Sequence, residues 1–581
     1  MGRIEPFEHP DVADARAGAD ARDVEAWHSI YSGKIGFEFM HMLEKDRIDW
    51  MRDTIEAGPA AFDANWVLER LMETELFEKF LHTKYVGSKR FSVEGVAALI
   101  PLLDSILDAS GGLGTEYLYI AMSHRGRLNV MKSIVNLPIE DIFAGIEDVD
   151  PRSVLGSGDV KYHIGATGRY HTRSGRDIEV HLSTNPSHLE AVDAVIMGRA
   201  RARQERWGST GVERILPVTL HGDAAFAGQG IASEVLNFAD IPHYEVGGTI
   251  HVIVNNLIGF TAEPIALHST RFSSEAAKRV SMPIIHVNAE APGAVWWAGQ
   301  IAAAYRRRFQ SDVLIDIIGF RRYGHSEIED PTITQPALYE KVSKHPLAWE
   351  VFAKELGLDA TTIETMKARA TAGLREGQEK GRQYQKRPVF WKLPEFWGRY
   401  VGGPYDPAYE VDTALPMERV RELCARLTTV PSGFTPHPKI AKLLQQRVEM
   451  VDGARKVDWG MAEALAFASL VTSGIRIRLT GQDSRRGTFN HRHAALIDVR
   501  KSDAYMPLAH IAEDQAEFIA VDTPLSEAAA MGFEYGYSRE FPDAMVLWEA
   551  QFGDFANGAQ VVFDQFISSG ERKWLRMSGL V

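Results

Sequence analysis

A carboxylate and an amide that follow two neighbouring strands are the first candidates for chemistry in this sequence. Asp223 and Asn256 lie 33 residues apart, about the length of one βαβ unit, and each follows an apolar, β-branched run, at 215–220 or 249–254. Ligands bind at the carboxyl ends of parallel strands, so we expect both side chains at one polar site. Because Mg²⁺ prefers oxygen ligands and shares them with phosphate, the pair predicts a metal–diphosphate site.

Three glycines beside Asp223 support the same interpretation. Gly222, Gly228 and Gly230 would let the backbone of a glycine-rich loop approach a phosphate, and the helix expected after them would turn its positive end toward it. As single residues, Asp223 and Asn256 are more simply explained as a helix cap and a turn. Their joint occurrence after consecutive strands favours the functional interpretation.

A second polar strand exit lies at His124, Arg125 and Arg127, directly after the apolar run at 115–122. An isolated His-Arg-Gly-Arg is more often a solvated turn. At the carboxyl end of a strand, however, arginine can bind a carboxylate through two hydrogen bonds, and a 2-oxo diacid offers two carboxylates. We therefore expect this segment to face the site.

Further candidates come from three other segments of the sequence. His163 follows a short strand, and Ser187 and Leu189 are expected to open a helix behind Pro186, where simple N-capping is the alternative. His325, in the charged loop at 321–331, is a further candidate for a role in the site. The competing explanation is a charged, solvated loop with no such role.

In the C-terminal part, the candidate is Glu527, which follows a predicted strand and begins a predicted helix. The simpler explanation for a glutamate at this position is that it stabilises the dipole of the helix. Asp483 and the His491/His493 pair are weaker candidates. A metal site at the histidine pair is discounted, because no third ligand is evident.

Composition narrows the class of protein. At 581 residues with 45% hydrophobic and 24% charged residues, the chain predicts a multidomain globular protein. A net charge of −14 makes nucleic acid an unexpected partner, and the single cysteine, Cys424, excludes an internal disulfide framework. No apolar run reaches the length of a membrane span, and the polar start is neither a signal nor a transit peptide, so a cytoplasmic location is expected, or the mitochondrial matrix in a eukaryote.

The order of predicted elements divides the chain into four parts. We expect an N-terminal helical region at 1–56, an α/β domain at 57–335, a helical and loop-rich interdomain region at 336–455, and a second α/β domain at 456–581.

Longer motifs identify a family. Gly222-Asp223-Ala224 followed by Asn255-Asn256 is similar to the thiamine diphosphate motif. Seven longer segments resemble the thiamine diphosphate-dependent first component of the 2-oxoglutarate dehydrogenase complex. They are HGDAAFAGQG, VNNLIGFT, SHRGRLNV, GDVKYHIGATG, NPSHLEAV, RGTFNHRHA and WEAQFGDFANGAQ. The resemblance runs from residue 90 to residue 581, about five-sixths of the chain.

The resemblance implies the thiamine diphosphate-binding fold, an α/β fold with two doubly wound parallel-sheet domains. The domain at 57–335 would be the complete diphosphate-binding domain, and the domain at 456–581 the pyrimidine-binding domain. Members of the family continue beyond the strand expected at the last residues, so the second domain is expected to be truncated. The implied cofactors are thiamine diphosphate and Mg²⁺.

The resemblance also assigns roles by residue. It implies that the metal is held by Asp223, Asn256 and the Ile258 carbonyl, and that the substrate is bound by His124, Arg125 and His163. The implied cofactor contacts are Ser187, Leu189, Asp223, Ala224, Ala225, Asn256, Glu527 and Gln551. The implied catalytic groups are Glu527, His124 and His163, with Glu527 bonding the pyrimidine ring of the cofactor.

The activity implied is oxidative decarboxylation of 2-oxoglutarate in the tricarboxylic acid cycle, with succinyl transfer to the lipoyl group of a dihydrolipoyl succinyltransferase that works with a dihydrolipoyl dehydrogenase. A homodimer is implied, since in the family each site takes its two domains from different subunits. Two alternatives stay open: a 2-oxoadipate dehydrogenase component, and a catalytically inactive scaffold of the same fold. The length of the preferred substrate would distinguish the first alternative from a 2-oxoglutarate enzyme. Binding of thiamine by the chain would distinguish an enzyme from the second alternative.

Overall fold

The computed structural model describes residues 30–31, 33–147 and 161–581. They form two compact units, one with residues up to 392 and 572–574, the other with residues 393–571 and 575–581. The first unit is longer than the predicted domain at 57–335, because it also holds residues 336–392. Of the predicted N-terminal helical region, residues 1–29 lie outside the described residues.

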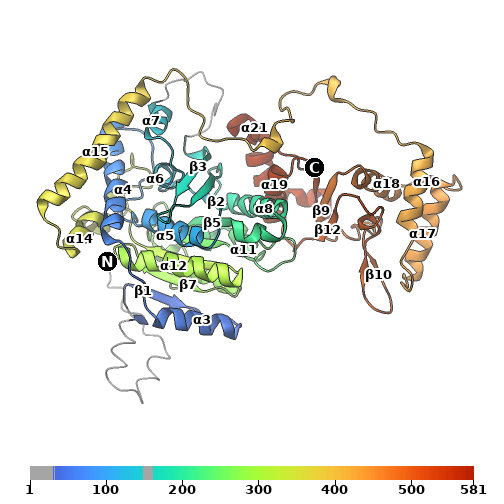
Figure 1. The fold of residues 1–581 in the computed structure, drawn as a ribbon, viewed down its shortest axis with the longest axis horizontal. Coiled ribbons are helices and arrows are strands. Elements are labelled where there is room, and N and C mark those ends of the chain that lie inside the picture. Colours follow the sequence, from blue (N-terminus) through green and yellow to red (C-terminus); the bar gives the residue numbers. More distant parts are fainter. Residues whose placement is uncertain (1–29, 32, 148–160) are drawn as a thin grey trace, which may run out of the picture. The chain divides into compact units, whose positions relative to one another are not determined.

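The first unit is built on an eight-stranded mixed sheet with the strand order β1-β7-β8-β6-β5-β2-β4-β3 (Figure 1). The six inner strands of this order are parallel, as predicted, whereas β1 and β3 pair antiparallel at the two edges. The strands are β1 (Ile35–Glu38), β2 (Tyr117–Met122), β3 (Ala166–His171), β4 (Asp177–Leu182), β5 (Ile215–Gly222), β6 (Ile250–Asn255), β7 (Ile284–Asn288) and β8 (Val313–Ile318).

Strand β1 differs from the prediction of a helical region at 1–56. Ile35 pairs with Val287 and Glu38 with Ile284, so the strand closes the β7 edge. The local sequence alternates apolar and polar residues, with Phe37 buried against the Trp297 ring at 5.6 Å between centroids. This period of two is the pattern of a strand with one buried face.

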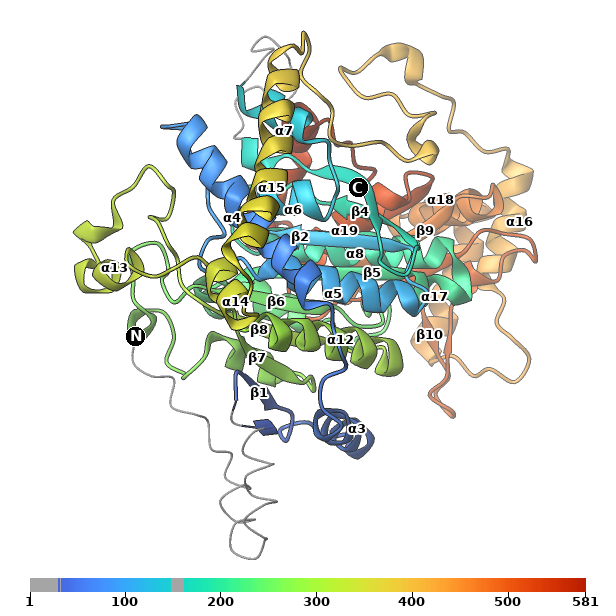
Figure 2. The same ribbon diagram turned by 60° about the vertical axis from the view of Figure 1, so that its left-hand side comes forward.

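Helices cover both faces of the sheet. On one face, α5 and α12 lie side by side and share the main hydrophobic core with β5, β6 and β8 (Figures 1 and 2). On the other face, α8 packs against β2, β5 and α11. The helices of this unit are α3 (Lys45–Glu56), α4 (Ala64–Lys84), α5 (Leu99–Gly112), α6 (Arg127–Ser133), α7 (Ile139–Glu147), α8 (Ala191–Arg206), α9 (Gly211–Arg214), α10 (Asp223–Gly228), α11 (Gly230–Leu236), α12 (Pro292–Phe309), α13 (Pro336–Val342), α14 (Ala348–Glu355) and α15 (Ala360–Arg382).

Residues 336–392 belong to this unit because their helices pack on it. Helix α15 lies along α4 and α7, and α14 also contacts α4 (Figure 2). Leu374 of α15 and Trp349 of α14 are part of the main hydrophobic core. A charged helical stretch that looked like an interdomain segment is therefore a covering layer with one buried face.

The second unit holds a three-stranded parallel sheet with the order β12-β9-β13. Its strands are β9 (Arg476–Gly481), β12 (Phe518–Asp522) and β13 (Ala544–Glu549), and a short hairpin joins β10 (Leu496–Ile497) to β11 (Ala504–Tyr505). The helices beginning in this unit are α16 (Met417–Thr428), α17 (Pro438–Val451), α18 (Trp459–Thr472), α19 (Ala528–Glu540), α20 (Gln560–Val562) and α21 (Ser568–Trp574). Leu580 bridges Val546 in parallel beside β13. Within the described residues, none of the helices is long and apolar enough to cross a lipid bilayer.

Candidate functional site

Asp223 and Asn256 line one cavity at the carboxyl edge of the large sheet. Asp223 is the first residue of α10, directly after β5, and Asn256 directly follows β6. Both side chains are buried, with exposed fractions of 4% and 8%. A Cβ atom at Gly259 would lie 2.8 Å from the Cβ of Ala224, so the loop after β6 packs directly against the start of α10. Glycine at 259 makes this close approach possible.

The loop after β6 is shaped by two asparagine turns. The Asn255 Oδ1 accepts a hydrogen bond from the Leu257 amide at 3.2 Å, and the Asn256 Oδ1 accepts one from the Ile258 amide at 3.3 Å. Leu257 has a φ of 62° and Phe260 a φ of 55°, both in the left-handed region. An amide oxygen has two lone pairs, so Asn256 keeps one for a ligand.

A buried chain of polar side chains anchors Asn255 from below. Its Nδ2 donates to the Asp316 Oδ1 at 3.0 Å, the Asp316 Oδ2 bonds the His286 Nδ1 at 3.0 Å, and the His286 Nε2 bonds the Glu38 Oε1 at 2.6 Å. Burial opposes a charge on His286, but Asp316 and Glu38 outweigh it and raise the pKa of His286 to about 9. The edge strand β1 therefore takes part in holding the loop that carries Asn256.

Electrostatics around Asp223 match a cation site. Burial, with a smaller contribution from Asp316, raises the pKa of Asp223 to about 6. A divalent cation would offset this cost of burying a carboxylate. The carboxylate of Asp223, the amide oxygen of Asn256 and the carbonyl of Ile258 are all hard oxygen donors of the kind that Mg²⁺ takes. The residues present thus fit a cation of this class.

The cavity has a volume of about 730 Å³ and lies within the first unit. The residues around it include most of those that the sequence predicts for this part of the chain. They are His124, Arg125, Ser187, Leu189, Asp223, Ala224, Ala225, Asn256, Ile258 and His325. His163 is not in the lining itself, but its Nε2 lies 3.0 Å from the Ser187 Oγ.

Two stacked rings of the cavity lining, Phe91 and His124, continue into a third ring, His163, which is not itself in the lining. The His124 ring stacks on Phe91 at 5.0 Å and on His163 at 5.1 Å between centroids. Burial, together with the neighbouring cationic groups, lowers the pKa of His124 to about 3. The pKa of His325 falls to about 4 for the same reasons. Both imidazoles are therefore neutral at pH 7, and the buried Nε2 of His124 has no hydrogen-bond partner among the described residues.

The two arginines of the His-Arg-Gly-Arg segment have different surroundings. Arg125 lines the cavity, and its guanidinium donates to the carbonyls of Ser92 at 2.9 Å and His325 at 3.0 Å. Arg127 is fully buried and donates to the carbonyls of Met122, Ile164 and Ser183. The expectation that the whole segment faces the site therefore holds for His124 and Arg125 and is wrong for Arg127, which ties backbone segments together.

Two local predictions around the cavity are also corrected. Ser187 and Leu189 lie in a turn instead of opening a helix, because Glu190 adopts a left-handed conformation with a φ of 65° and α8 begins at Ala191. The predicted glycine-rich loop after Gly222 is instead two short helices, α10 and α11. Gly228 and Gly230 do not line the cavity, and a Cβ atom at either would meet nothing within 4 Å.

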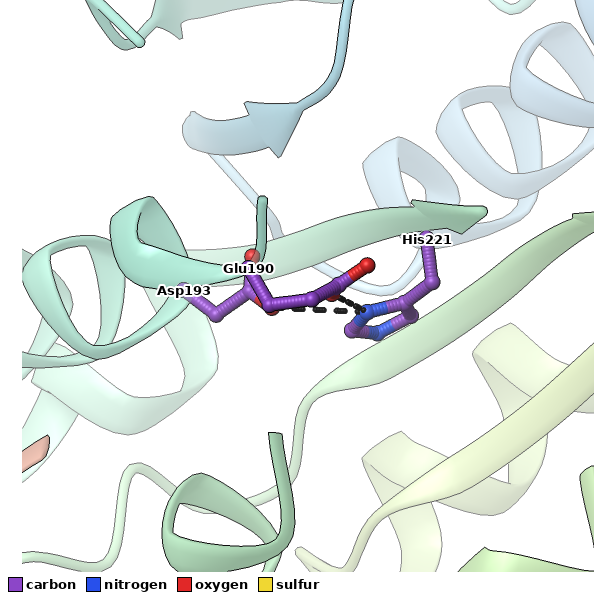
Figure 3. A group of neighbouring side chains, drawn as sticks. All are labelled: Glu190, Asp193 and His221. Carbon is purple, nitrogen blue, oxygen red and sulfur yellow. Dashed lines mark hydrogen bonds and ion pairs between the residues drawn. The ribbon is translucent and has the colours of Figure 1, made fainter. Parts of the chain in front are cut away.

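A buried cluster is centred on the cavity-lining residue His221, which precedes Asp223 by two residues in the sequence (Figure 3). Its Nδ1 lies 2.5 Å from the Glu190 Oε2 and 3.4 Å from the Asp193 Oδ2. The Nε2 is 2.9 Å from the Thr219 Oγ1 and 3.0 Å from the His251 Nδ1. Burial opposes protonation, but the two carboxylates prevail and raise the pKa of His221 to about 10. The ring is thereby held rigidly two residues before Asp223.

Glu190, Asp193 and His221 each have a possible metal-ligand atom within 4.8 Å of the others, and they are the group of this kind found among the described residues. His221 is hydrogen-bonded directly to Glu190, whereas the buried Oδ2 of Asp193 has no hydrogen-bond partner among the described residues. Among the described residues, His491 and His493 do not belong to such a grouping.

In the second unit, Glu527 and Gln551 follow the carboxyl ends of β12 and β13, which flank β9. The partly buried Glu527 is the residue before α19, and its Oε1 accepts a hydrogen bond from the Gln482 Nε2 at 2.9 Å. Gln482 itself follows β9. Asp483, the next residue, has a φ of 55° and is exposed. The polar edge of this smaller sheet therefore carries Gln482 and Glu527 in direct contact.

Several residues of the cavity lining were not expected from the sequence, among them Lys89, Phe91 and Tyr162. The Phe91 ring contacts both His124 and the Tyr162 ring, the latter at 5.4 Å. Lys89 and Phe91 flank Arg90, at which the family resemblance begins, so their position at the start of the resembling region was the available signal.

Comparisons with known proteins agree with this geometry. Residues 69–386 match the family model described as the dehydrogenase E1 component, and residues 455–581 match the pyrimidine binding domain of transketolase. The chain is 43% identical over 566 residues to the 2-oxoglutarate dehydrogenase E1 component of Cupriavidus necator, an alignment that covers 95% of this chain and 59% of that protein. It is 41% identical over 585 residues to the protein of the same name from Bacillus licheniformis, covering 96% and 61%, respectively.

A protein of that name from Brucella anthropi is 42% identical over 572 residues, covering 95% of this chain and 57% of the relative. The chain thus spans about three-fifths of the length of these curated relatives. The family model, by contrast, matches more than half of the chain, over the unit that contains the cavity. On this match, the chain belongs to the dehydrogenase E1 component family.

Proposed function

We propose that this chain acts in the oxidative decarboxylation of 2-oxoglutarate with thiamine diphosphate and Mg²⁺. The observation that carries the proposal is the lining of the 730 Å³ cavity, where the oxygen donors of Asp223, Asn256 and Ile258 share one space with the neutral imidazole of His124. The name of the relatives, 2-oxoglutarate dehydrogenase E1 component, supports the choice of substrate.

In this proposal, Asp223, Asn256 and the Ile258 carbonyl hold Mg²⁺, and Ala224, Ala225, Ser187 and Leu189 contact the cofactor. When bound, thiamine diphosphate supplies the carbon that adds to the 2-oxo group and accepts the electron pair left by carbon dioxide. Glu527 and Gln551 are the proposed contacts of the pyrimidine ring. The support for Glu527 is its place after a parallel strand, in a segment that matches a pyrimidine binding domain.

The histidines would handle protons and hydrogen bonds in this scheme. A neutral His124 whose Nε2 lacks a partner among the described residues has a site for a substrate oxygen or proton. His163, hydrogen-bonded to Ser187 and stacked on His124, would orient it. Arg125 keeps its charge, although burial lowers its pKa to about 10, and contributes positive potential beneath the substrate.

The proposal includes partners. The four-carbon unit would pass to the lipoyl group of a dihydrolipoyl succinyltransferase that works with a dihydrolipoyl dehydrogenase. The family resemblance also supports a homodimer, in which the cavity of one chain takes Glu527 from a second chain. The single cysteine is compatible with a cytoplasmic location.

The experiment is carbon dioxide release from 2-oxoglutarate by the 581-residue chain, with thiamine diphosphate, Mg²⁺ and an artificial electron acceptor. Three variants accompany the unchanged chain. Asp223→Asn should lose Mg²⁺-dependent cofactor binding, and Glu527→Ala should lose turnover while retaining most of that binding. Exposed Glu513→Ala is the matched control and should behave like the unchanged chain.

Each outcome bears on a different part of the proposal. Faster turnover of 2-oxoadipate would move the substrate assignment to the longer diacid. Cofactor binding without turnover of any 2-oxo acid would favour an inactive module of the same fold. Full turnover by Glu527→Ala would overturn the role given to Glu527.

A further inference from the structure

The buried cluster around His221 has the ligand types of a metal site (Figure 3). Glu190 directly precedes α8 and Asp193 lies in its first turn, whereas His221 lies near the end of β5. All three side chains are buried. Imidazole nitrogen and carboxylate oxygen are both ordinary ligands of Zn²⁺ in proteins. Two separate elements thus bring such ligands together in the interior of the first unit.

One carboxylate of the cluster lacks a partner. The Glu190 Oε2 is hydrogen-bonded to the His221 Nδ1. The Asp193 Oδ2 lies 3.4 Å from the same nitrogen and has no hydrogen-bond partner among the described residues, although Asp193 is only 2% exposed. An imidazole carries at most one positive charge, and it faces two carboxylates here. Because a buried anionic oxygen without a partner costs free energy, a divalent cation at this point would be stabilising.

The spacing of the ligand atoms suits a tetrahedral ion after one small movement. The three atoms lie within 4.8 Å of one another. Ligands held at about 2.0–2.2 Å from Zn²⁺ in a tetrahedron lie about 3.3–3.6 Å apart. The Asp193 Oδ2 and the His221 Nδ1 already have this spacing, at 3.4 Å. The Glu190 carboxylate would move away from His221 by about 1 Å as the ion takes the place of the shared proton.

The other nitrogen of His221 is supported in the way that metal-bound histidines are. The Nε2 lies 3.0 Å from the His251 Nδ1, and the His251 Nε2 lies 3.4 Å from the Asp312 Oδ2. Asp312 is fixed in turn, since its Oδ1 accepts a hydrogen bond from the Thr249 amide at 2.7 Å. A ligating histidine commonly donates its second N–H to such an acceptor, which fixes the tautomer. With the His221 Nε2 donating to His251, the lone pair of Nδ1 points to the carboxylates.

We propose that Glu190, Asp193 and His221 bind a transition-metal ion of the Zn²⁺ class, which ties the beginning of α8 to the end of β5. His221 lines the 730 Å³ cavity, so the cavity gives the ion a route to the cluster. The imidazole ligand favours Zn²⁺ and Co²⁺ over Mg²⁺, which takes oxygen ligands. The site goes beyond the proposed function, because it shares no residue with the proposed Mg²⁺ ligands and requires no thiamine diphosphate.

The test uses Co²⁺, which takes the ligands of Zn²⁺ and absorbs visible light strongly with four ligands and weakly with six. The chain is freed of metal with a chelator and titrated with Co²⁺ in the absence of thiamine diphosphate. The unchanged chain should give the four-ligand spectrum, and so should Asp223→Asn, which removes a proposed Mg²⁺ ligand. Asp193→Asn should lose this spectrum and bind Co²⁺ about tenfold or more weakly.

Asp177→Asn is the matched control for the loss of a carboxylate. Asp177 pairs with His171 at 2.5 Å, the same distance as in the pair of Glu190 and His221, but both side chains are largely exposed. This variant should keep the Co²⁺ spectrum. Circular dichroism shows whether Asp193→Asn retains the fold of the unchanged chain, so that loss of the spectrum reports on the ligand.

A second measurement needs no variant. Crystals of the unchanged chain are soaked in Zn²⁺, and the anomalous signal on the two sides of the zinc absorption edge should place the ion among the three ligand atoms. The inference is overturned if the zinc signal is absent there, or if Asp193→Asn keeps the four-ligand Co²⁺ spectrum. It is also overturned if Asp223→Asn abolishes that spectrum, since the ion would then occupy the proposed Mg²⁺ site. Neither measurement involves turnover, so failure of the proposed function would leave both results unchanged.

Discussion

The side chains of Asn255 and Asp316 are joined by a hydrogen bond of 3.0 Å beneath the loop that carries Asn256. Asn255 is not itself a proposed ligand. Its amide group connects the fully buried carboxylate of Asp316 to the backbone of Leu257, which has a left-handed conformation. The position of the proposed metal ligands therefore depends on a residue that points away from the metal, and this dependence can be tested.

Replacing Asn255 by alanine should weaken Mg²⁺-dependent thiamine diphosphate binding by about tenfold, because Leu257 loses its side-chain acceptor and Asp316 loses a donor. The measurement is a calorimetric titration at fixed Mg²⁺. Asn288→Ala is the control, since Asn288 forms the same kind of turn with the Glu290 amide at 2.9 Å at the end of β7. Equal effects of the two substitutions would contradict a specific role for Asn255.

Gly259→Ala should impair both folding stability and cofactor binding. The added Cβ atom would lie 2.8 Å from the Cβ of Ala224 and 2.8 Å from the Leu267 side chain, so α10 or the loop must shift. We expect a loss of about 1–3 kcal/mol in the free energy of unfolding, measured with urea.

Gly228→Ala is the contrast to this substitution, because nothing lies within 4 Å of the new atom. Since alanine favours helix, Gly228→Ala should be neutral or stabilising by up to about 1 kcal/mol. Loss of cofactor affinity in Gly228→Ala would restore the role in phosphate binding that the sequence suggested for this residue.

The stability of the first unit should decrease at alkaline pH. Asp316 and Glu38 raise the pKa of His286 to about 9, above its ordinary value of about 6.5. A raised pKa in the folded state stabilises the protein fully below pH 6.5, and this contribution is lost as the pH rises through 9. His286→Gln should therefore flatten the fall in unfolding free energy between pH 6.5 and 9, by about 3 kcal/mol at most. An unchanged pH profile in this variant would mean that His286 is neutral in the folded protein.

The pair between His221 and Glu190 should matter far more than a surface pair. Both side chains are buried, and Glu190→Gln leaves a charged imidazole with Asp193 alone, so we expect a loss of about 3–5 kcal/mol in unfolding free energy. Glu213→Gln removes a pair with Arg307 of similar length, 2.6 Å, whose side chains are 46% and 30% exposed. That control should cost about 0–1 kcal/mol. Chemical denaturation of both variants at pH 7 measures the difference.

The sequence was sufficient for the parts of the site that depend on strand spacing. Asp223 and Asn256 end consecutive parallel strands, and this relation brings them to the same edge whatever the detail of the loops. The parallel strands β2, β5 and β6 were predictable for the same reason, since they are continuous apolar runs. The roles given to individual residues stay predictions until the experiments above are done.

Features that depend on tertiary contacts were not predictable. Strand β1 has four residues, too few to stand out beside the helical spacing around it, and its pairing with β7 is set by burial of Phe37. Arg125 and Arg127 are of one residue type and two positions apart, so only packing separates the one in the cavity from the one in the core. The left-handed Glu190 is stabilised by His221, which is 31 residues away. Local propensity carries no information about such partners.

The pairing of β1 also bears on where this protein can be divided. The family model begins at residue 69, yet Glu38 completes the chain of contacts that runs through His286 and Asp316 to Asn255. A fragment that begins at residue 69 would leave β7 with an unpaired edge, open to strand addition by another molecule, and His286 with one carboxylate partner fewer. For this domain, the region that the family model matches and the region that completes the sheet begin more than thirty residues apart.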